Sequence, residues 1–283
     1  MNNGVFRLGY NTNGLAHHRL DDSFRLLADL GYEAVAVTPC VSGLDPLRPV
    51  AGEAQALRVL AEDLGLELTL ESGSRFLLDP LRKHRPTLIE EEPGGRLMRR
   101  EFLEHHIDLA AELGAPLLSI WSGAAPEKEG APPEILQARL IEELRPLLER
   151  CDKAGVSLSL EPEPGMFIET CADFDRLTAE LGGDGASLGL TMDVGHLLVT
   201  GEALPEDELR RRAGALAHVH LDDIAKGEHI HLPFGVGDLN LAAVISALLE
   251  TGYSGVAALE LSRDSHRGAQ AAAEGLAAVR SAL

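Results

Sequence analysis

Short apolar stretches alternate along the chain with longer stretches of helical period. Eight of the short stretches have the length and apolar content of buried strands, at residues 6–11, 34–39, 67–73, 116–123, 156–161, 188–193, 216–222 and 256–261. Eight amphipathic stretches predict helices, at residues 21–30, 52–64, 101–113, 133–154, 173–181, 205–215, 239–251 and 268–283. This eightfold alternation predicts an α/β fold, the (β/α)₈ TIM barrel. Since no linker-like tract interrupts it, we expect one domain over residues 1–283.

Alternation inside each strand predicts which side chains point at the barrel axis. In the fifth stretch the alternate apolar residues face the helices, so Glu161 faces the axis together with two serines. The same period directs polar residues of other strands inward, namely Thr69, Glu71, Thr191, Asp193, His218, His220, Asp222 and Glu260. Several strands therefore present a polar residue at their C-terminal end, the face that carries the active site of a barrel.

Four of these residues predict a metal site. Glu161, Asp193, His220 and Glu260 end the fifth to the eighth strand. Three carboxylates aimed at one point would repel one another, and a divalent cation removes that repulsion. Three oxygen ligands and one nitrogen suit Mn²⁺, Mg²⁺, Co²⁺ or Zn²⁺. The alternative is that an error in strand register groups four unrelated residues.

Charge and composition narrow the function classes. The chain has 283 residues, with 25 basic and 45 acidic side chains and a net charge of −20. Such a surface repels nucleic acid and anionic lipid, and aromatic residues make up only 4%, which disfavours base stacking. No apolar run approaches the roughly 20 residues that span a bilayer. Three unevenly spaced cysteines and a first segment without a signal core predict a cytoplasmic protein with free thiols.

Five motifs occur in a fixed order. They are LSLEPEPG at 158–165, LTMDVGH at 190–196, AHVHLDD at 217–223, HLPFGVGDLN at 231–240 and GVAALEL at 255–261. Together with the strand pattern they resemble the xylose-isomerase-like TIM barrel superfamily, over essentially the whole chain. That superfamily contains sugar isomerases and epimerases, inosose-processing enzymes and, more distantly, apurinic-site endonucleases.

The resemblance implies a ligand set and a mechanism. Glu161, Asp193, His220 and Glu260 match the residues that bind one divalent metal in the family. A substrate with a hydroxyl beside its carbonyl would chelate that metal, which stabilises the enediolate formed when a C–H proton leaves. In the epimerase branch the two metal-bound glutamates are also the acid–base pair, so proton transfer is assigned to Glu161 and Glu260.

The resemblance also implies contacts around the metal. His196 lies where family members touch a substrate hydroxyl, and support of a metal ligand is its alternative role. Lys226 falls where an epimerase-branch member has a cationic substrate contact, and a solvated loop lysine is the alternative. In the endonuclease branch the next loop helps to hold an extra zinc, so a second metal at His196, His229 and His231 stays open.

Position alone predicts further substrate contacts. Trp121, the only tryptophan, points into the barrel mouth by parity, where it could stack on a sugar face or cap the core. Glu71 points there as well, and Asn11 directly follows the first strand as a candidate hydroxyl partner. Two adjacent pairs of histidines, His17–His18 and His105–His106, are expected at the surface.

A basic segment interrupts the acidic background. Residues 75–85 carry Arg75, Arg82, Lys83 and Arg85 against one aspartate. Because the segment follows the third strand, it predicts a grip on an anionic group of the substrate, with Arg75 as a contact. The alternative is a loop that forms salt bridges with the acidic residues 90–92.

The sequence therefore predicts a divalent-metal-dependent isomerase or epimerase of a sugar, sugar phosphate or related polyol ketone. Its partner is a small-molecule carbohydrate rather than nucleic acid or membrane, and a homodimer is the family-level expectation. A keto-inositol dehydratase, which would follow the same proton removal with loss of a β-hydroxyl, stays open. So does an endonuclease-like metal phosphodiesterase, although the net charge disfavours a DNA groove. A sugar-binding barrel without activity is the non-enzymatic alternative.

Overall fold

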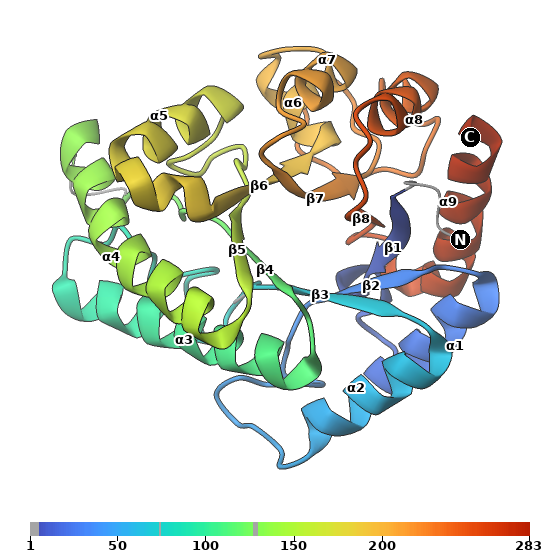
Figure 1. Ribbon diagram of the computed structural model, residues 1–283, viewed down its shortest axis with the longest axis horizontal. Helices are drawn as coiled ribbons and strands as arrows, with labels where there is room; N and C mark the ends of the chain where they lie inside the picture. Colours follow the sequence, from blue (N-terminus) through green and yellow to red (C-terminus); the bar gives the residue numbers. More distant parts are fainter. Residues whose placement is uncertain (1–5, 74, 127–129) are drawn as a thin grey trace. The chain divides into compact units, whose positions relative to one another are not determined.

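The computed structural model describes residues 6–73, 75–126 and 130–283. Eight parallel strands follow one another in chain order around a closed barrel, which confirms the predicted fold class (Figure 1). The strands are β1 (Arg7–Asn11), β2 (Ala34–Val37), β3 (Glu67–Glu71), β4 (Leu117–Ile120), β5 (Ser157–Leu160), β6 (Leu188–Asp193), β7 (Leu216–Leu221) and β8 (Val256–Leu259). Each lies within a stretch predicted from the sequence, so the short apolar stretches located all eight.

Helices follow the strands as the sequence predicts. The α-helices in the described residues are α1 (Leu20–Leu30), α2 (Glu53–Leu64), α3 (Pro93–Leu113), α4 (Pro133–Ala154), α5 (Cys171–Leu181), α6 (Val194–Thr200), α7 (Pro205–Arg211), α8 (Leu241–Glu250) and α9 (Gly268–Ala282). Short 3₁₀ helices are η1 (Thr12–Leu15), η2 (Gly182–Ser187) and η3 (Ser265–Arg267). Within the described chain, no helix is both long and apolar enough to cross a membrane.

The contacts of the chain divide it into two units. The first comprises the described parts of Met1–Val37, Val59–Thr69 and Leu190–Leu283, and the second comprises those of Thr38–Arg58 and Leu70–Gly189. In the first unit β1 pairs with both β2 and β8, and β7 pairs with β6 and β8. In the second unit β4 pairs with β3 and β5, while α3 packs against α4 (Figure 1).

Helices α3 and α6 differ from the sequence prediction, and α7 ends at Arg211 instead of residue 215. Helix α3 begins at Pro93, earlier than the predicted start at residue 101. The two glycines after Pro93 lower helix propensity, but proline suits the first position of a helix. The short helix α6 was not predicted. It begins directly after β6, where the Asp193 side chain accepts hydrogen bonds from the backbone N–H groups of Gly195 and His196.

One histidine is misplaced by the sequence prediction. His106 was expected at the surface, but it is fully buried in α3, and one of its ring nitrogens lies 2.8 Å from the carbonyl oxygen of Phe102. His105 beside it is exposed as predicted. The helix turns neighbouring side chains by about 100°, so one of the pair faces the core. Burial lowers the pKa of His106 to about 4.

Candidate metal centre

Three of the four predicted ligands lie together in the first unit. Asp193 is the last residue of β6, His220 lies in β7, and Glu260 directly follows β8. Pairing of Asp193 with His220 in the sheet brings the first two side by side. The Nδ1 atom of His220 lies 3.1 Å from Glu260 Oε2 and 4.0 Å from Asp193 Oδ2. The structure thus brings two of the predicted carboxylates and the predicted imidazole together.

Asp193 is oriented by the helix that follows it. Its Oδ1 atom accepts hydrogen bonds from the backbone N–H of Gly195 (2.7 Å) and of His196 (3.0 Å). The other oxygen, Oδ2, lies 3.7 Å from His196 Nε2. Because the N-terminus of α6 holds Oδ1, Oδ2 is the oxygen that faces the imidazoles of His196 and His220.

Glu260 is held at both of its carboxylate oxygens. Asn13 Nδ2 donates a hydrogen bond of 2.7 Å to Oε1, while Oε2 faces His220. Burial alone would raise the pKa of Glu260, but His220, His231 and Asn13 stabilise the anion and hold its pKa below the usual range. The carboxylate is therefore in the form that binds a cation or accepts a proton.

Three histidines form a second cluster in the same unit. His196, His229 and His231 place ligand nitrogens within 4.8 Å of one another. The Nε2 atoms of His196 and His229 are 3.1 Å apart, so one of the two must donate a proton or both must face a shared cation. This set of nitrogen ligands could hold a second metal ion, the possibility that the sequence leaves open.

The pKa values of His229 and His231 are shifted in opposite directions. Burial, followed by the charge of His231, lowers the pKa of His229. Burial also opposes the charged form of His231, but an ion pair of 2.7 Å with Asp222 overcomes it and raises the pKa of His231 to about 10. The cluster therefore carries one fixed positive charge, which Asp222 neutralises.

The loop that carries these histidines is tied down by Asp223. Its carboxylate accepts backbone hydrogen bonds from Gly235 (2.7 Å), Gly237 (2.9 Å) and Leu239 (2.9 Å). Sequence reasoning gave no role to Asp223 and none to Asn13, and it missed the partnership of Asp222 with His231. Besides the motif at 231–240, the adjacent aspartates directly after β7 are the local signal that pointed to this loop.

The other predicted residues of the first unit differ in exposure. His196 is 5% exposed and belongs to the histidine cluster. Asn11 is buried, and its side chain accepts a hydrogen bond from the backbone N–H of Asn13. The side chain of Lys226 is exposed, while its backbone N–H donates to Asp238 at 2.8 Å.

The second unit carries the fourth predicted ligand. Glu161 directly follows β5, is 4% exposed, and donates its backbone N–H to the carbonyl of Ile120. Glu71 is the buried last residue of β3. Trp121 follows β4. Its ring centroid lies 4.7 Å from the ring centroid of His84 and 5.6 Å from Cζ of the Arg99 guanidinium. The tryptophan ring is thus packed at least in part against protein groups.

The basic segment is partly neutralised by ion pairs. Arg82 pairs with Asp79 at 2.6 Å and Arg85 with Glu90 at 2.8 Å. Arg75 is exposed, and its backbone N–H donates to His84 Nδ1 at 3.0 Å. Burial, followed by the nearby charges of Lys83 and Arg99, lowers the pKa of His84 to about 3. The alternative of a loop paired with residues 90–92 therefore accounts for Arg85, whereas Arg82 pairs with the aspartate of the segment itself.

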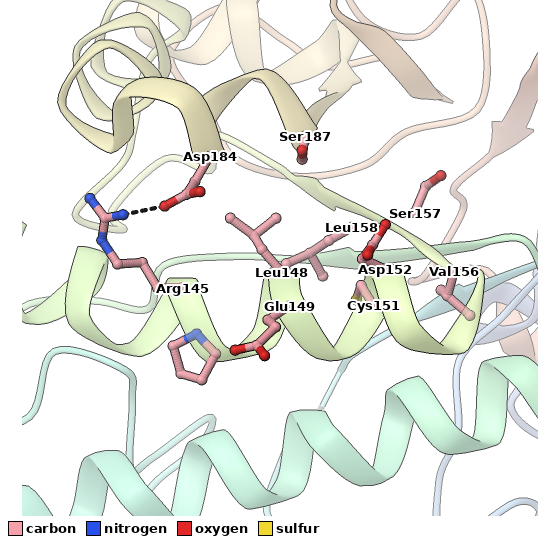
Figure 2. A pocket seen from close by; sticks show the side chains of 11 residues that line it. Arg145, Leu148, Glu149, Cys151, Asp152, Val156, Ser157, Leu158, Asp184 and Ser187 are labelled. Carbon is pink, nitrogen blue, oxygen red and sulfur yellow. Dashed lines mark hydrogen bonds and ion pairs between the residues drawn. The ribbon is translucent and has the colours of Figure 1, made fainter.

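A separate cavity of about 920 Å³ also lies in the second unit, between α4, the start of β5 and η2. Figure 2 shows Arg145 and Asp184 paired across it, with Cys151 and Ser157 on its wall. Val156 and the first two residues of β5 line this cavity, whereas Glu161 follows the other end of the strand. Because barrel active sites lie at the C-terminal ends of strands, this cavity is not the candidate site.

The donor set of the first unit fits a divalent cation. Asp193 and His220 are 2% and 1% exposed, and buried carboxylates next to an imidazole form a ligand set of the hard-to-borderline kind. The model of one known family, described as xylose isomerase-like TIM barrel, matches residues 24–282. The chain belongs to this family.

Two curated relatives of this family member are dehydratases by name. The 3-dehydroshikimate dehydratase of Pseudomonas aeruginosa is 27% identical over 272 residues, which cover 93% of this chain and 39% of that protein. The inosose dehydratase of Lacticaseibacillus casei is 29% identical over 143 residues, which cover 44% of this chain and 47% of that protein. The matched regions thus span less than half the length of each relative.

Solved structures share the fold over nearly the whole chain. The 3-keto-D-glucoside 4-epimerase of E. coli has a TM-score of 0.78 at 18% identity and covers 98% of this chain and 99% of its own. A IolI protein crystallised with a bound zinc atom has a TM-score of 0.76 at 16% identity and covers 98% of both chains. At these identities the likeness shows the shared barrel.

Proposed function

We propose that this protein is a divalent-metal-dependent isomerase or epimerase of a sugar, sugar phosphate or related polyol ketone. One observation carries the proposal, namely the convergence of Asp193, His220 and Glu260 at the ends of β6, β7 and β8. Membership of the xylose isomerase-like family supports it, as do structural neighbours that are named as epimerases.

The proposed ligands are Asp193, His220, Glu260 and Glu161. Glu161 is assigned by the family resemblance and by its place after β5, since the C-terminal ends of parallel strands meet at one end of a barrel. A divalent ion bound there would supply the positive charge that stabilises an oxyanion developing beside the carbon that loses its proton.

Proton transfer is assigned to the two glutamates. Glu260 is held as the anion by His220 and Asn13, so it can accept a proton from a substrate carbon. Glu161 is the proposed second base, on the opposite face of that carbon. In an epimerase one glutamate would remove the proton and the other would return one to the far side, which inverts the carbon.

Substrate recognition is assigned to polar groups around these ligands. His196, whose Nε2 atom lies 3.7 Å from Asp193 Oδ2, is the proposed partner of a substrate hydroxyl. Lys226, Trp121, Glu71, Asn11 and Arg75 complete the proposed set of contacts. The proposed partner is a small-molecule carbohydrate, with no role for nucleic acid or membrane, and the proposed assembly is a homodimer in the cytoplasm.

Dehydration is the second candidate reaction, and the names of both curated relatives favour it. The same glutamate would remove the proton beside the carbonyl. It would then deliver that proton to a β-hydroxyl, which leaves as water, instead of a proton returning to the carbon. The product would be an unsaturated ketone, which ultraviolet absorption detects, whereas an epimer shows no such band.

A metal assay and an exchange assay test the proposal together. We expect about one divalent ion per chain by mass spectrometry, and deuterium uptake from D₂O into at least one member of a panel of keto and aldo sugars. Glu161→Gln and Glu260→Gln keep an oxygen ligand but lose the basic carboxylate. Each should retain measurable metal and lose about 10²–10⁴-fold in turnover.

The pattern of exchange separates the reactions. In an epimerase, each glutamine variant could still exchange the proton of one epimer without completing the conversion, whereas an aldose–ketose isomerase works on one face and depends on one base. Full metal content with near-native rates in both variants would show that neither glutamate is the base. A protein that binds no divalent ion would refute the proposed function altogether.

A further inference from the structure

Asn13 links the first strand of the chain to the candidate metal centre. It lies in η1, directly after β1, and Glu260 directly follows β8. Pairing of β1 with β8 matches Tyr10 with Leu259, which brings the two segments together across the closure of the sheet. As a result, Asn13 Nδ2 donates a hydrogen bond of 2.7 Å to Glu260 Oε1, between residues 247 positions apart.

The backbone of Asn13 is fixed from both sides. Its N–H donates to the side chain of Asn11 at 3.0 Å, and its carbonyl accepts a hydrogen bond of 2.8 Å from Ser265 Oγ. The next residue, Gly14, packs closely, because a Cβ atom there would lie 2.8 Å from Tyr10 Oη and 3.0 Å from the carbonyl oxygen of Leu261. The Asn13 amide is therefore presented from a rigid segment.

Glu260 is the side chain that most needs such support. Its side chain is 15% exposed, against 0% for Asp193 and 1% for His220. The last torsion of a glutamate is broad, so its carboxylate plane is not set by its own rotamer. Asn13 at Oε1 and His220 at Oε2 together define that plane, and Asn13 is the member of the pair that stands outside the proposed ligand set.

We propose that Asn13 is a positioning residue that sets the carboxylate plane of Glu260 and thereby the strength of divalent-metal binding. The inference rests on the metal site proposed above. Groups that hydrogen-bond to metal ligands typically contribute 10–100-fold to metal affinity. Asn13 therefore belongs to the functional centre although it neither binds the metal nor carries a charge.

Cobalt affinity tests this role without any substrate. Metal-free protein is titrated with Co²⁺ against a competing chelator, and the visible spectrum reports the ligand geometry. Asn13→Ala should bind Co²⁺ about 10–100-fold more weakly and change the spectrum, because Glu260 loses its fixed plane. Asn13→Asp should bind at least as tightly as the wild type, since a carboxylate placed beside Glu260 adds repulsion that the cation relieves.

Matched variants separate this role from general damage. Asn240→Ala also removes an asparagine hydrogen bond, the one that Asn240 Oδ1 accepts from the backbone of Ala243, and its cobalt affinity should stay within twofold of the wild type. Asn13→Ser serves where Asn13→Ala fails to fold, because a serine is too short to reach Glu260. Equal weakening in Asn13→Ala and Asn13→Asp would show a purely structural role and overturn the proposal.

The metal site itself is tested in the same titration. Asp193→Ala and Glu260→Ala should each lose most of the cobalt affinity. If both bind Co²⁺ like the wild type, the proposed metal site is wrong. If both lose affinity while Asn13→Ala stays within twofold of the wild type, the metal site stands and the role of Asn13 is overturned.

Discussion

At the scale of single residues, the partner of a buried side chain decides its charge. His231 and His106 are both largely buried, yet their pKa values move in opposite directions. Burial lowers the pKa of His106, and the hydrogen bond with the carbonyl of Phe102 only partly opposes this effect. The carboxylate of Asp222 reverses the effect of burial at His231. Charge near the candidate metal centre is therefore set by individual contacts rather than by depth.

Replacement of Asp222 by asparagine should discharge His231. Burial would then lower the pKa of His231 well below about 10, because only the charges of Glu260 and Asp193 would be left to raise it. A raised histidine pKa stabilises the fold fully below about 6.5, and this stabilisation is lost as the pH rises towards 10. The Asp222→Asn variant should not show this loss of folding stability at alkaline pH. NMR titration of the metal-free protein measures the pKa, with Asp238→Asn as control. An unchanged pKa would show that a group other than Asp222 raises the pKa of His231.

His106 should make the protein sensitive to acid. Its pKa is lowered to about 4, so the unfolded chain binds a proton that the folded chain rejects. The stabilisation is complete above about 6.5 and is lost as the pH falls towards 4. His106→Leu should reduce this loss by roughly 3 kcal/mol, at 1.36 kcal/mol for each pKa unit. Urea unfolding at several pH values measures it, and the exposed His105→Leu should change nothing. If wild type and His106→Leu lose the same stability at acid pH, His106 is not the cause of that loss.

At the scale of elements, the ends of strands and starts of helices build the site. Helix α6 orients Asp193 through its first N–H groups, and η1 presents Asn13 to the end of β8. The segment after β7 is held by Asp223 and carries the histidine cluster. Each device uses a backbone N–H or a fixed turn beside the strand end. Small backbone shifts in these elements should therefore change the function more than changes in the outer helices.

Gly195 is the position where such a shift is easiest to impose. A Cβ atom there would lie 2.4 Å from Asp222 Oδ1 and 2.7 Å from the Ile224 side chain. Gly195→Ala should cost about 1–3 kcal/mol in the free energy of unfolding, the usual range for overpacking, and weaken metal binding by displacing Asp193. Denaturant unfolding and metal titration measure the two effects. Gly214→Ala is the control, since nothing lies within 4 Å of a Cβ atom at Gly214. Equal behaviour of the two variants would refute the steric argument.

The basic segment after β3 gives an element-scale prediction on substrate charge. Arg82 and Arg85 are paired with acids, so Arg75 and Lys83 are the cations proposed for an anionic substrate group. Arg75→Gln with Lys83→Gln should raise the KM for an anionic substrate about five- to tenfold and leave an uncharged analogue nearly unaffected. Steady-state kinetics on both substrates, with Arg82→Gln as control, provides the comparison. Equal effects on both substrates would favour a purely structural loop.

At the scale of the whole molecule, one ion would tie distant parts of the chain together. The proposed ligands are separated by up to 99 positions, from Glu161 to Glu260. None of them can form a site in the unfolded chain, so metal binding should add directly to the stability of the fold. The metal is thus expected to be structural as well as functional.

Removal of the metal should therefore destabilise the protein and stop its reaction. A ligand that binds only the folded state at about 100 times its Kd adds about 2.7 kcal/mol. EDTA should lower the Tm by several degrees and abolish turnover, and Mn²⁺ or Co²⁺ in excess should restore both. Thermal melts with and without EDTA measure the effect. A Tm independent of EDTA would contradict the ligand set.

Local periodicity determined much of this protein by itself. Short apolar stretches located all eight strands, and the two-residue period within β6 and β7 placed Asp193 and His220 on a common side. The eightfold alternation then implied the barrel, because parallel strands joined by helices have few other ways to close. These features depend on residues close in sequence, which is why the sequence alone could determine them.

Contacts across the sheet were decided only by the tertiary structure. The bond from Asn13 to Glu260 joins residues 247 positions apart, through the pairing of β1 with β8 that closes the barrel. The ion pair of Asp222 with His231 depends on how a long loop folds back over β7. The burial of His106 depends on which face of α3 meets the core. Periodicity gives the direction of a side chain from its own strand or helix, but its partner is chosen by the packing of elements that are distant in the chain.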